Sequence, residues 1–473
     1  MGLGDLPEGL ISNCLSRHIL ADFDGGDISS DGGALLLRTV EELTGIVQQV
    51  AARFTDHRDP DLIEHPLKDL VAQRVYALAL GYEDLNDHDD LRRDPLLATV
   101  VGKADPTGKG RRRLRDRGKP LAGKSTLDRL ELTRVGDGRA SRYTKITCDT
   151  RDVERLLVTL FLQAHREPPK RIVLDLDATD DPIHGHQLGR FFHGYYKSYC
   201  YLPLYIFSGD HLLCARLRPS DIDASAGAVK QLERIVSQVR AAWPGVEVVI
   251  RADSGFCREP IMAWCEANGV DHLLGLAQNK RLVAMIAAEQ ERARQEFERT
   301  KGPARVFAEL RYETLKTWSR ERRVVAKAEH LAKGANPRFV VTSLSSEARG
   351  AKPLYEEDYC GRGEAENRIK EQQLHLFADR TSARTMRANQ IRLSFSSMAY
   401  VLLNALRRLG LAGTDLAEAQ CQTIRLKVLK IGTLVRVTVR KVWVRLASGC
   451  PYAEVFRRVH ANLMQLPPLI LRC

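Results

Sequence analysis

Alternating apolar and polar positions predict a series of β-strands through the middle of the chain. The clearest is residues 171–177, RIVLDLD, in which every second residue from Ile172 is aliphatic, the two-residue period of a strand. The same period predicts further strands at 201–207, 211–217, 246–253 and 271–276. Apolar residues spaced three and four apart predict amphipathic helices at about 224–243 and 260–268.

The order of these elements indicates the fold class. Three strands, a helix, a strand, a helix and a strand are the order of an RNase H-like core, an α/β fold with a mixed sheet and helices on both faces. We assign this core to residues 168–276 and, after a mainly β insertion at 277–350, to a helical second part at 351–410. Residues 1–165 are predicted to be mostly helical, and residues 411–473 to form a small basic region.

Two acids interrupt the strand at 171–177, whose other residues are typical of a protein core. A buried carboxylate costs several kcal/mol unless a cation meets it. Asp175 and Asp177 therefore indicate either an edge strand with solvated acids or a metal ion at the strand end. We favour Asp177 as the reactive acid because it ends the strand and precedes Ala-Thr. Asp175, on the same strand face, is its main rival.

The composition is that of a globular protein with a basic surface. Hydrophobic residues make up 44% and charged residues 28% of the 473 residues, and the net charge of +12 favours a polyanionic partner, nucleic acid before membrane. The chain has no long uncharged apolar run and no secretory signal pattern, and its ten cysteines are scattered without a C-x-x-C pair. We therefore expect a cytoplasmic protein with reduced cysteines.

Two segments concentrate the positive charge. Residues 103–124 hold nine Lys or Arg against two acids and are either a solvated loop or a phosphate-binding arm. Residues 434–445 alternate apolar with basic residues or Thr, which indicates a strand with a cationic face for DNA or an edge strand that its charge protects against aggregation. The candidate DNA contacts in the two segments are Arg111, Arg112, Arg113, Lys124, Arg436, Arg440 and Lys441.

Three acids lie where the predicted fold could bring them together. Asp177 ends the first strand and Asp253 ends the fourth, in IRADSGF, so neighbouring strands would place both at one edge of the sheet. Glu366 lies on a predicted helix at about 358–376. The other polar residues on its face are Tyr359, Arg362 and Lys370. Alone, this helix face would be an ordinary ladder of ion pairs; with the two aspartates, we interpret it as part of an active site.

Converging carboxylates suit a divalent metal. Mg²⁺ prefers carboxylate oxygens in octahedral geometry, and two such ions can activate a water or 3′-hydroxyl and stabilise the leaving oxygen. Without metal the acids would repel one another, so at least one would have a raised pKa. Arg362 and Lys370 would suit the binding of a DNA phosphate. We therefore predict two Mg²⁺ ions, which Mn²⁺ could replace.

These motifs resemble a known family. Asp177-Ala-Thr, Asp253-Ser-Gly and Tyr359-x2-Arg362-x3-Glu366, with the strings LDLDATDDPIHG and IRADSGFCREPIMAWCE, are similar to DDE transposases of bacterial insertion sequences, in the group numbered thirteen-eighty. The resemblance covers about residues 20–460. It implies an RNase H-like fold, a β-strand insertion before the Glu, two Mg²⁺ ions, and the cutting and joining of double-stranded DNA at terminal inverted repeats.

The resemblance also implies roles for individual residues. Asp177, Asp253 and Glu366 match the catalytic, metal-binding acids, and Tyr359 and Arg362 match DNA-binding positions of the helix motif. It implies a homodimer in the DNA complex and a bacterial, nucleoid-associated protein, in which the 1–165 region would bind DNA.

Two further positions bear on this resemblance. The Lys expected seven residues after the Glu is Gln373 here, which makes Lys370 the candidate to act in its place. In relatives an aromatic residue of the insertion stacks on a flipped base, and Trp318 is our candidate. An equal alternative is that Trp318 covers a β-surface.

Other residues near the predicted site are not expected to take part in catalysis. Residues 180–181, two aspartates, are predicted to form a solvated turn. Cys257 is predicted to be a small buried hydrophobe. Three histidines without a cysteine at zinc-site spacing are predicted to be structural or DNA-contacting, namely His184, His186 and His193.

Two other functions stay open at this point. A related metal-dependent nuclease would share the three acids but cleave DNA without joining strands. A non-catalytic, domesticated DNA-binding regulator would keep the basic surfaces and need no acids, and the presence of all three argues against it.

Overall fold

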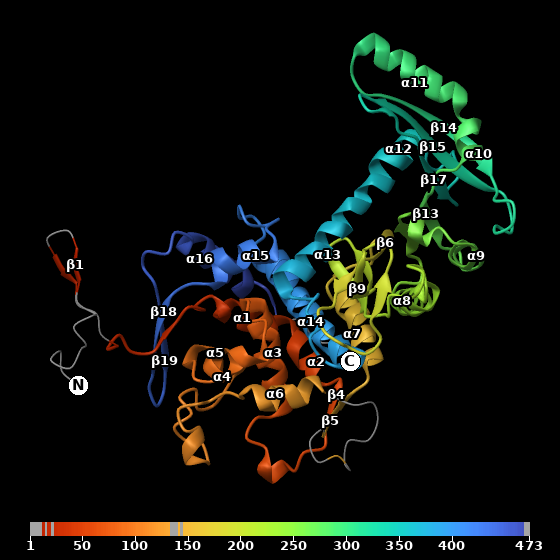
Figure 1. Ribbon diagram of the computed structural model, residues 1–473. Helices are drawn as coiled ribbons and strands as arrows, with labels where there is room; N and C mark the ends of the chain where they lie inside the picture. The colour runs from red at the N-terminus through yellow and green to blue at the C-terminus, as the bar shows by residue number, and fades with distance from the viewer. Residues whose placement is uncertain (1–11, 15–16, 20–22, 133–140, 142–144, 468–473) are drawn as a thin grey trace. The chain divides into compact units, whose positions relative to one another are not determined.

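The computed structural model describes residues 12–14, 17–19, 23–132, 141 and 145–467 (Figure 1). The chain divides into two compact units, of which the first consists of residues 1–48, 59–130 and 405–473. The second consists of residues 49–58 and 131–404 and contains all three candidate acids. This division into two units does not test the boundaries of the five regions expected from the sequence, which stay a prediction. In the described part of the chain, no helix is long and apolar enough to cross a membrane.

The second unit is built on a nine-stranded mixed sheet. Its first five strands along the chain are β6 (Arg171–Ala178), β10 (Leu204–Ser208), β11 (His211–Arg216), β12 (Glu247–Ala252) and β13 (Asp271–Leu276). They lie in the order β11-β10-β6-β12-β13; β6, β12 and β13 are parallel, β10 is antiparallel to β6, and β11 is antiparallel to β10. This is the strand order of an RNase H-like core, and the predicted α/β class with a mixed sheet is confirmed.

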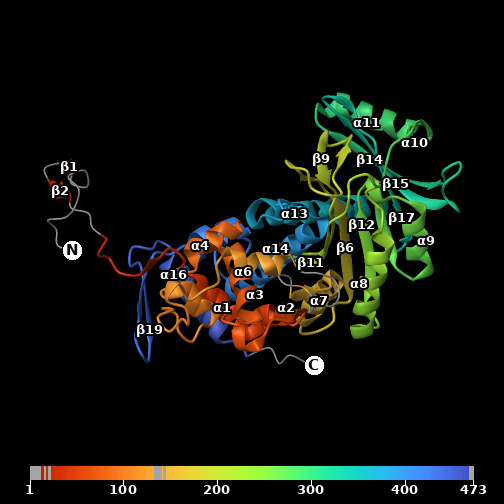
Figure 2. The same ribbon diagram turned by 60° about the horizontal axis from the view of Figure 1, so that its bottom comes forward.

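Helical segments cover both faces of this sheet (Figure 2). The helices α7 (Thr150–Gln163), α8 (Ala228–Ala242) and α9 (Glu259–Ala267) pack on one face, against a cluster that includes Leu174 and Ile250. Val249, the residue before Ile250 on β12, points to the other face, where it packs with Leu354 and Tyr355. The period of two in the sequence therefore reflects burial on both sides of the sheet.

The insertion after β13 extends the central sheet. Its elements are α10 (Lys280–Met285), α11 (Ala287–Thr300), β14 (Ala304–Tyr312), β15 (Arg322–Leu331), β16 (Gly334–Ala335) and β17 (Arg338–Thr342). Strand β17 pairs antiparallel with β13, and β15 and β14 follow in the same sheet, with α11 laid across them (Figure 1). The β character predicted for 277–350 is present, and it continues the core sheet instead of forming a separate layer.

The helical segment that carries Glu366 is irregular at its start. It consists of α12 (Ala351–Pro353), a π-helical turn (Leu354–Tyr359), a 3-10 turn (Cys360–Arg362) and α13 (Gly363–Leu376), and α14 (Met386–Gly410) follows. The helix predicted at about 358–376 is present, but it is α-helical only from Gly363, and residues 358–362 lie in the π and 3-10 turns. Two glycines, Gly361 and Gly363, weaken helix formation there, and the side chain of Arg251 bonds the carbonyl of Asp358.

Arg251 joins this segment to the sheet. Arg251 lies directly opposite Asp175 in the β6–β12 register, and its guanidinium donates to both carboxylate oxygens of Asp175 at 2.5 and 2.8 Å. A third nitrogen of the same group donates to the carbonyl oxygen of Asp358. A Cβ on Gly361 would lie 2.6 Å from that guanidinium, so glycine leaves room for this contact. The buried acid Asp175 therefore has a structural partner.

Two smaller sheets lie in the second unit, and a short hairpin lies near the N-terminus. β7 (Asp181–Pro182), β8 (Phe191–His193) and β9 (Ser198–Tyr201) form a sheet in the order β7-β9-β8. β4 (Phe54–Asp56) pairs with β5 (Ile146–Cys148), and β1 (Ser12–Cys14) pairs with β2 (Arg17–Ile19).

The first unit is mainly helical. Its helices, with α2 and α6 reaching its borders, are α1 (Ala34–Thr44), α2 (Ile46–Ala51), α3 (Leu67–Leu80), α4 (His88–Leu91), α5 (Pro95–Val101), α6 (Lys124–Glu131), α15 (Cys421–Ile424) and α16 (Ala453–Met464). Segments from both ends of the sequence pack within it: the backbone N–H of Gly33 donates to the carbonyl of Leu429 at 3.0 Å. A Cβ on Gly33 would collide with the backbone of Val428, so this approach requires glycine.

The basic tail forms a hairpin. β18 (Thr433–Val437) pairs antiparallel with β19 (Val442–Leu446), and β18 also pairs with β3 (Ile28–Ser29). The prediction of one continuous strand at 434–445 was wrong, because the chain turns at 438–441. The Thr438 side chain closes this turn, since its hydroxyl donates to the Lys441 carbonyl at 2.8 Å and accepts from the Lys441 N–H at 3.1 Å.

Replacing Arg251 by leucine should destabilise the fold strongly, because Asp175 would stay buried without its cation. We expect a loss of about 3–5 kcal/mol in the free energy of unfolding, measured by urea titration. Arg171→Leu is the matched control, since Arg171 pairs with Glu247 across the same two strands but with side chains 51% and 61% exposed. That variant should lose less than about 1 kcal/mol. Equal losses in the two variants would contradict this role of Arg251.

Candidate active site

Two of the candidate acids lie at neighbouring strand ends. Leu176 on β6 is opposite Ala252 on β12 in the parallel register, so Asp177 and Asp253 occupy the next position on each chain. Adjacent strands are about 4.8 Å apart, which brings the two carboxylates to one edge of the sheet. Asp253 turns the chain out of the strand, because its Oδ1 accepts the backbone N–H of Gly255 at 2.8 Å.

Glu366 reaches the same neighbourhood from α13. Its Oε1 forms an ion pair with Nη2 of Arg362 at 2.6 Å, and the two side chains are 38% and 21% exposed. Burial opposes the charge of Arg362, but the negative charge of Glu366, with smaller contributions from Asp177 and Asp253, raises the pKa of the guanidinium. Arg362 is therefore the cation that lies among the three acids.

The carboxyl of Asp177 has a strongly perturbed acidity. Burial raises its pKa most, the charge of Asp253 raises it further and Glu366 adds a smaller effect, so the pKa reaches about 7 despite the opposing charge of Arg362. Unlike Asp175, Asp177 has no bidentate arginine; its Oδ1 accepts only the N–H of Ala178 at 2.9 Å among its described hydrogen bonds. The uncompensated charge on β6 is thus at position 177.

The hydroxyl of Tyr359 lies beside β13 and the turn at Asp253. A Cβ on Gly275 of β13 would collide with the Tyr359 hydroxyl and would lie 3.1 Å from the backbone nitrogen of Ser254. Burial raises the pKa of the Tyr359 phenol, and the charge of Asp253 adds to this while Arg362 opposes it. The glycine therefore makes the space in which this hydroxyl lies beside the Asp253 turn.

The donor chemistry of the three acids fits a hard divalent cation, although their side chains do not close into a metal site. Among the described residues, no three His, Cys, Asp or Glu side chains are grouped closely enough to hold one ion. Arg362, paired with Glu366, supplies positive charge there instead. The raised pKa of Asp177 reflects the crowding of negative charge that a cation would relieve. Asp177, Asp253 and Glu366 would be the ligands.

The side chain of Gln373 forms hydrogen bonds within the protein. Its side-chain nitrogen donates to Oδ1 of Asp181 at 2.9 Å and to the carbonyl of Asp180 at 3.2 Å, while Lys370 is exposed. The prediction of a solvated turn was wrong for Asp181, which is fully buried. Burial raises the pKa of Asp181 well above its ordinary value, which favours the neutral acid.

The remaining residues near the acids have structural environments. Cys257 is buried, as predicted, and burial raises the pKa of its thiol to about 12, so it is a poor nucleophile. His184 and His186 are exposed, and His186 lies 3.0 Å from the guanidinium of Arg190. Among the residues that the structure describes, these histidines join no metal-ligand cluster.

Trp318 packs against the protein. It lies in the loop between β14 and β15, with Tyr312 in an edge contact at 5.7 Å and the Arg322 guanidinium 5.5 Å from its ring centre. Its backbone N–H donates to the hydroxyl of Thr314 at 2.8 Å. These contacts favour the role of covering a β-surface, and the base-stacking role stays a prediction.

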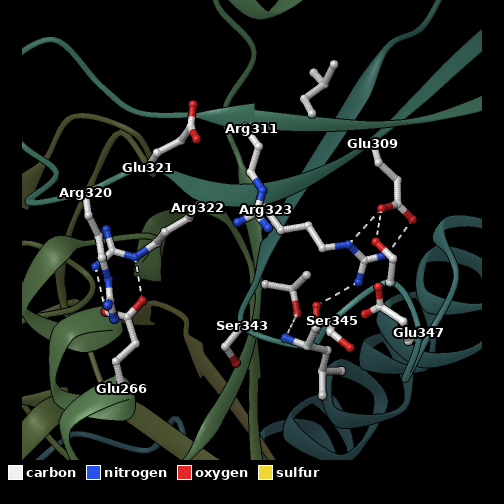
Figure 3. A pocket seen from close by; sticks show the side chains of 14 residues that line it. Glu266, Glu309, Arg311, Arg320, Glu321, Arg322, Arg323, Ser343, Ser345 and Glu347 are labelled. Atoms are coloured by element: carbon white, nitrogen blue, oxygen red, sulfur yellow. Dashed lines mark hydrogen bonds and ion pairs between the residues drawn. The ribbon is translucent and has the colours of Figure 1, made fainter.

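A separate cleft of about 410 Å³ lies at one end of the inserted strands (Figure 3). Three of its arginines pair with acids of the protein: Arg322 pairs with Glu266 at 2.7 Å, and Arg323 pairs with Glu309 at 2.6 Å. Arg320 also contacts Glu266. None of the three candidate acids lines this cleft, so it is distinct from the candidate active site.

The candidate DNA contacts of the 103–124 segment differ in exposure. Arg111 is largely buried and bonds Glu64 at 2.5 Å and the ring of His65 at 2.8 Å, which favours a structural role. Arg112 and Arg113 are exposed, although Arg112 donates to the carbonyl of Asp61 at 3.2 Å. The fourth residue, Lys124, is exposed and begins helix α6. DNA contact by these four residues stays a prediction.

The tail hairpin presents its basic residues to solvent. Arg436 is exposed on β18, opposite the half-exposed Trp443 on β19. Arg440 and Lys441 lie in the exposed turn, and the Lys441 amine is 5.6 Å from the Trp443 ring centre. A basic surface beside an exposed aromatic ring suits nucleic acid, and contact with DNA by these residues stays a prediction.

Two features of the site escaped sequence reasoning. The contact of Arg251 with Asp175 and Asp358 follows from strand register, which no local pattern reveals. The other is an exposed aromatic hairpin between β7 and β10, for which the string FFHGYYKSY was a visible signal.

An RNase H-like sheet with acids at the ends of two neighbouring strands and a third acid from a later helix defines a class of phosphoryl-transfer enzymes that act on nucleic acids. This chain belongs to the family described as "Transposase DDE domain group 1", which matches residues 11–468. It is therefore a DNA transposition enzyme, of a family that generally uses divalent metal ions.

Comparison with solved structures gives a distant likeness. The chain is similar to a piggyBac transposase in a synaptic complex with hairpin DNA, with 9% sequence identity, a TM-score of 0.38, and coverage of 85% of this chain and 80% of the other. No curated protein matches this chain.

The acidity of Asp177 predicts a pH-dependent stability. Its folded-state pKa of about 7 lies above the ordinary 3.8, so the folded protein binds more protons than the unfolded chain between these values and loses stability as the pH rises through them. Asp177→Asn should remove about 1–2 kcal/mol of this loss after allowance for solvent screening. Metal-free urea titrations at pH 4.5 and 8 measure it. Asp221→Asn, at an exposed position, is the control. The same pH profile in both variants would contradict the assignment.

Proposed function

We propose that this transposase cleaves double-stranded DNA at the terminal inverted repeats of a bacterial insertion sequence and joins the freed 3′ ends to target DNA. The observation that carries the proposal is the β6–β12 register, which sets Asp177 and Asp253 at neighbouring strand ends, together with the ion pair of Glu366 and Arg362 next to them. Burial, then Asp253 and then Glu366 raise the pKa of Asp177, in keeping with this arrangement. Three acids from separate parts of the chain therefore interact in one place. Such crowding costs stability and is typical of a site in which carboxylates share cations.

Each residue of the site has a proposed role. Asp177, Asp253 and Glu366 hold two divalent ions, Mg²⁺ or Mn²⁺, which when bound polarise the phosphate and make a water or 3′-hydroxyl a better nucleophile. Arg362 leaves Glu366 and binds a non-bridging oxygen of the cleaved phosphate. Tyr359 positions the turn that carries Asp253, because its hydroxyl packs against that turn.

The basic surfaces hold the DNA outside the site. The exposed residues proposed to contact phosphates are Arg112, Arg113, Lys124, Lys370, Arg436, Arg440 and Lys441. Such contacts provide affinity without sequence information and make binding sensitive to salt. Two transposon ends must be cut and joined together, so we propose that a homodimer forms on the DNA.

Neutralising any of the three acids should abolish cleavage and leave DNA binding intact. We expect Asp177→Asn, Asp253→Asn and Glu366→Gln each to lower the rate of end cleavage at least about 100-fold, because each removes a charge from the metal site. Glu364→Gln is the matched control, since Glu364 is exposed on the same helix. Cleavage is measured on a labelled duplex that carries the inverted repeat, and binding by gel shift. Full activity in any of the three variants would exclude that acid from catalysis.

Strand joining distinguishes a transposase from a nuclease. With pre-cut ends that carry a free 3′-hydroxyl, Mg²⁺ and a supercoiled plasmid, the wild-type protein should give joined products on a gel. A 3′-deoxy end should give none, because it lacks the nucleophile. Cleavage of uncut ends without any joining of pre-cut ends would instead identify a metal-dependent nuclease.

A further inference from the structure

A hairpin of exposed aromatic residues lies between β7 and β10. We call residues 190–199 the aromatic hairpin; it comprises β8, the first half of β9 and the turn between them. Four of its rings are exposed: Phe191 by 42%, Phe192 by 57%, Tyr195 by 84% and Tyr199 by 48%. Exposed aromatic surface of this extent indicates a binding role when it is gathered in one place.

The rings of the hairpin are arranged with positive charge. Phe192 and Tyr199 are opposite each other in the β8–β9 register, with ring centres 5.6 Å apart. The guanidinium of Arg190 lies 4.6 Å from the centre of the Tyr199 ring, and Lys197 is exposed in the turn. The sequence from 182 to 209 contains no acid. This surface therefore suits a ligand that is both flat and anionic.

The hairpin borders the candidate active site. The hydroxyl of Tyr196 donates to the carbonyl of Ala178, the residue after Asp177, at 3.4 Å. Burial raises the pKa of the Tyr196 phenol, and the charges of Asp180 and then Asp177 raise it further. Strand β9 runs on into β10, where Tyr205 is opposite Asp177 in the register. A polymer bound at Asp177 would therefore pass close to this hairpin.

The base of the hairpin is held without the exposed rings. The Tyr201 hydroxyl donates to the carbonyl of Leu188 at 2.7 Å, and the Ser220 hydroxyl donates to that of Phe191 at 2.9 Å. The N–H of Leu188 donates to the carbonyl of Arg384 at 3.0 Å. Cys200 and Tyr201 are fully buried. The exposed rings are thus mounted on a fixed base and contribute little to holding it.

We propose that the aromatic hairpin binds unpaired nucleobases of the DNA end beside the cleavage site, with bases stacked on Phe192, Tyr195 and Tyr199 and the adjoining phosphates on Arg190 and Lys197. This inference rests on the proposed DNA cleavage. Bases in an intact duplex already stack on each other, so only bases that are unpaired can use the rings. The hairpin favours a melted or frayed end and thereby keeps the cleaved strand at the acids.

Binding to two matched DNA ends tests the proposal. The full-length protein in metal-free buffer is titrated against a fluorescent inverted-repeat end that is fully paired, and against one with three unpaired bases at the cleavage position. Tyr195→Ala and Tyr199→Ala should each weaken binding to the unpaired end about tenfold and change binding to the paired end less than about twofold. A 2-aminopurine among the unpaired bases should be quenched by the wild type and brighter with both variants.

The controls separate stacking from folding. Tyr199→Phe keeps the ring and should bind like the wild type, and Leu188→Ala removes a non-aromatic side chain that is 56% exposed and should have no effect. Equal weakening on both DNA ends, or no weakening on either, overturns the proposal. A change of oligomeric state in both alanine variants, without loss of DNA affinity, overturns it in favour of a contact between protein chains. Asp177→Asn tests the proposed function separately, because it should stop cleavage and keep the preference for the unpaired end.

Discussion

The charge of Asp175 lies buried in the central sheet, and Arg251 on the neighbouring strand neutralises it with two hydrogen bonds. An ion pair in this position is costly to break, because either partner alone would be an uncompensated buried charge. The same guanidinium bonds the carbonyl of Asp358 at the start of the segment that carries Tyr359, Arg362 and Glu366. One side chain therefore couples the strand of the first acid to the helix of the third.

The two acids of β6 show how environment separates structure from chemistry. Asp175 and Asp177 are two residues apart and share one face of the strand, but only Asp175 has a bidentate arginine. Asp177 lies at the strand end beside other acids, with a pKa near 7. Arg362 offsets part of this charge through Glu366. The site thus keeps an excess of negative charge, and such perturbed groups cluster at functional sites.

Local pattern predicted the sheet well, because the strands are short apolar runs that end at turns. It also predicted that Asp177 and Asp253 would lie at one edge, since acids at the ends of parallel neighbouring strands must meet there. Local pattern could not predict which distant segments of the chain pair with each other. The partner of Asp175, the burial of Asp181 against Gln373 and the joining of β17 to β13 all depend on segments distant in sequence.

The structure also differs from the sequence prediction at two other places. The tail turn at 438–441 contains no Gly, Pro, Asn or Asp, and the hydroxyl of Thr438 closes it instead. The irregular turns at 354–362 keep a helical spacing of residues, so the sequence resembles a regular helix although the backbone departs from one. The roles of individual residues toward DNA are also beyond pattern alone, as the internal contacts of Arg111 and Trp318 illustrate.

The central claim is that Asp177, Asp253 and Glu366 meet around the same cations. Iron-directed cleavage of the backbone tests it most directly: Fe²⁺ is bound in place of Mg²⁺, ascorbate and peroxide are added, and the fragments are sized by mass spectrometry. If the three acids share the cations, cuts should cluster near residues 177, 253 and 366, and excess Mg²⁺ should suppress all of them. Cuts near only one of these residues, or at sites elsewhere that Mg²⁺ suppresses equally, would contradict it.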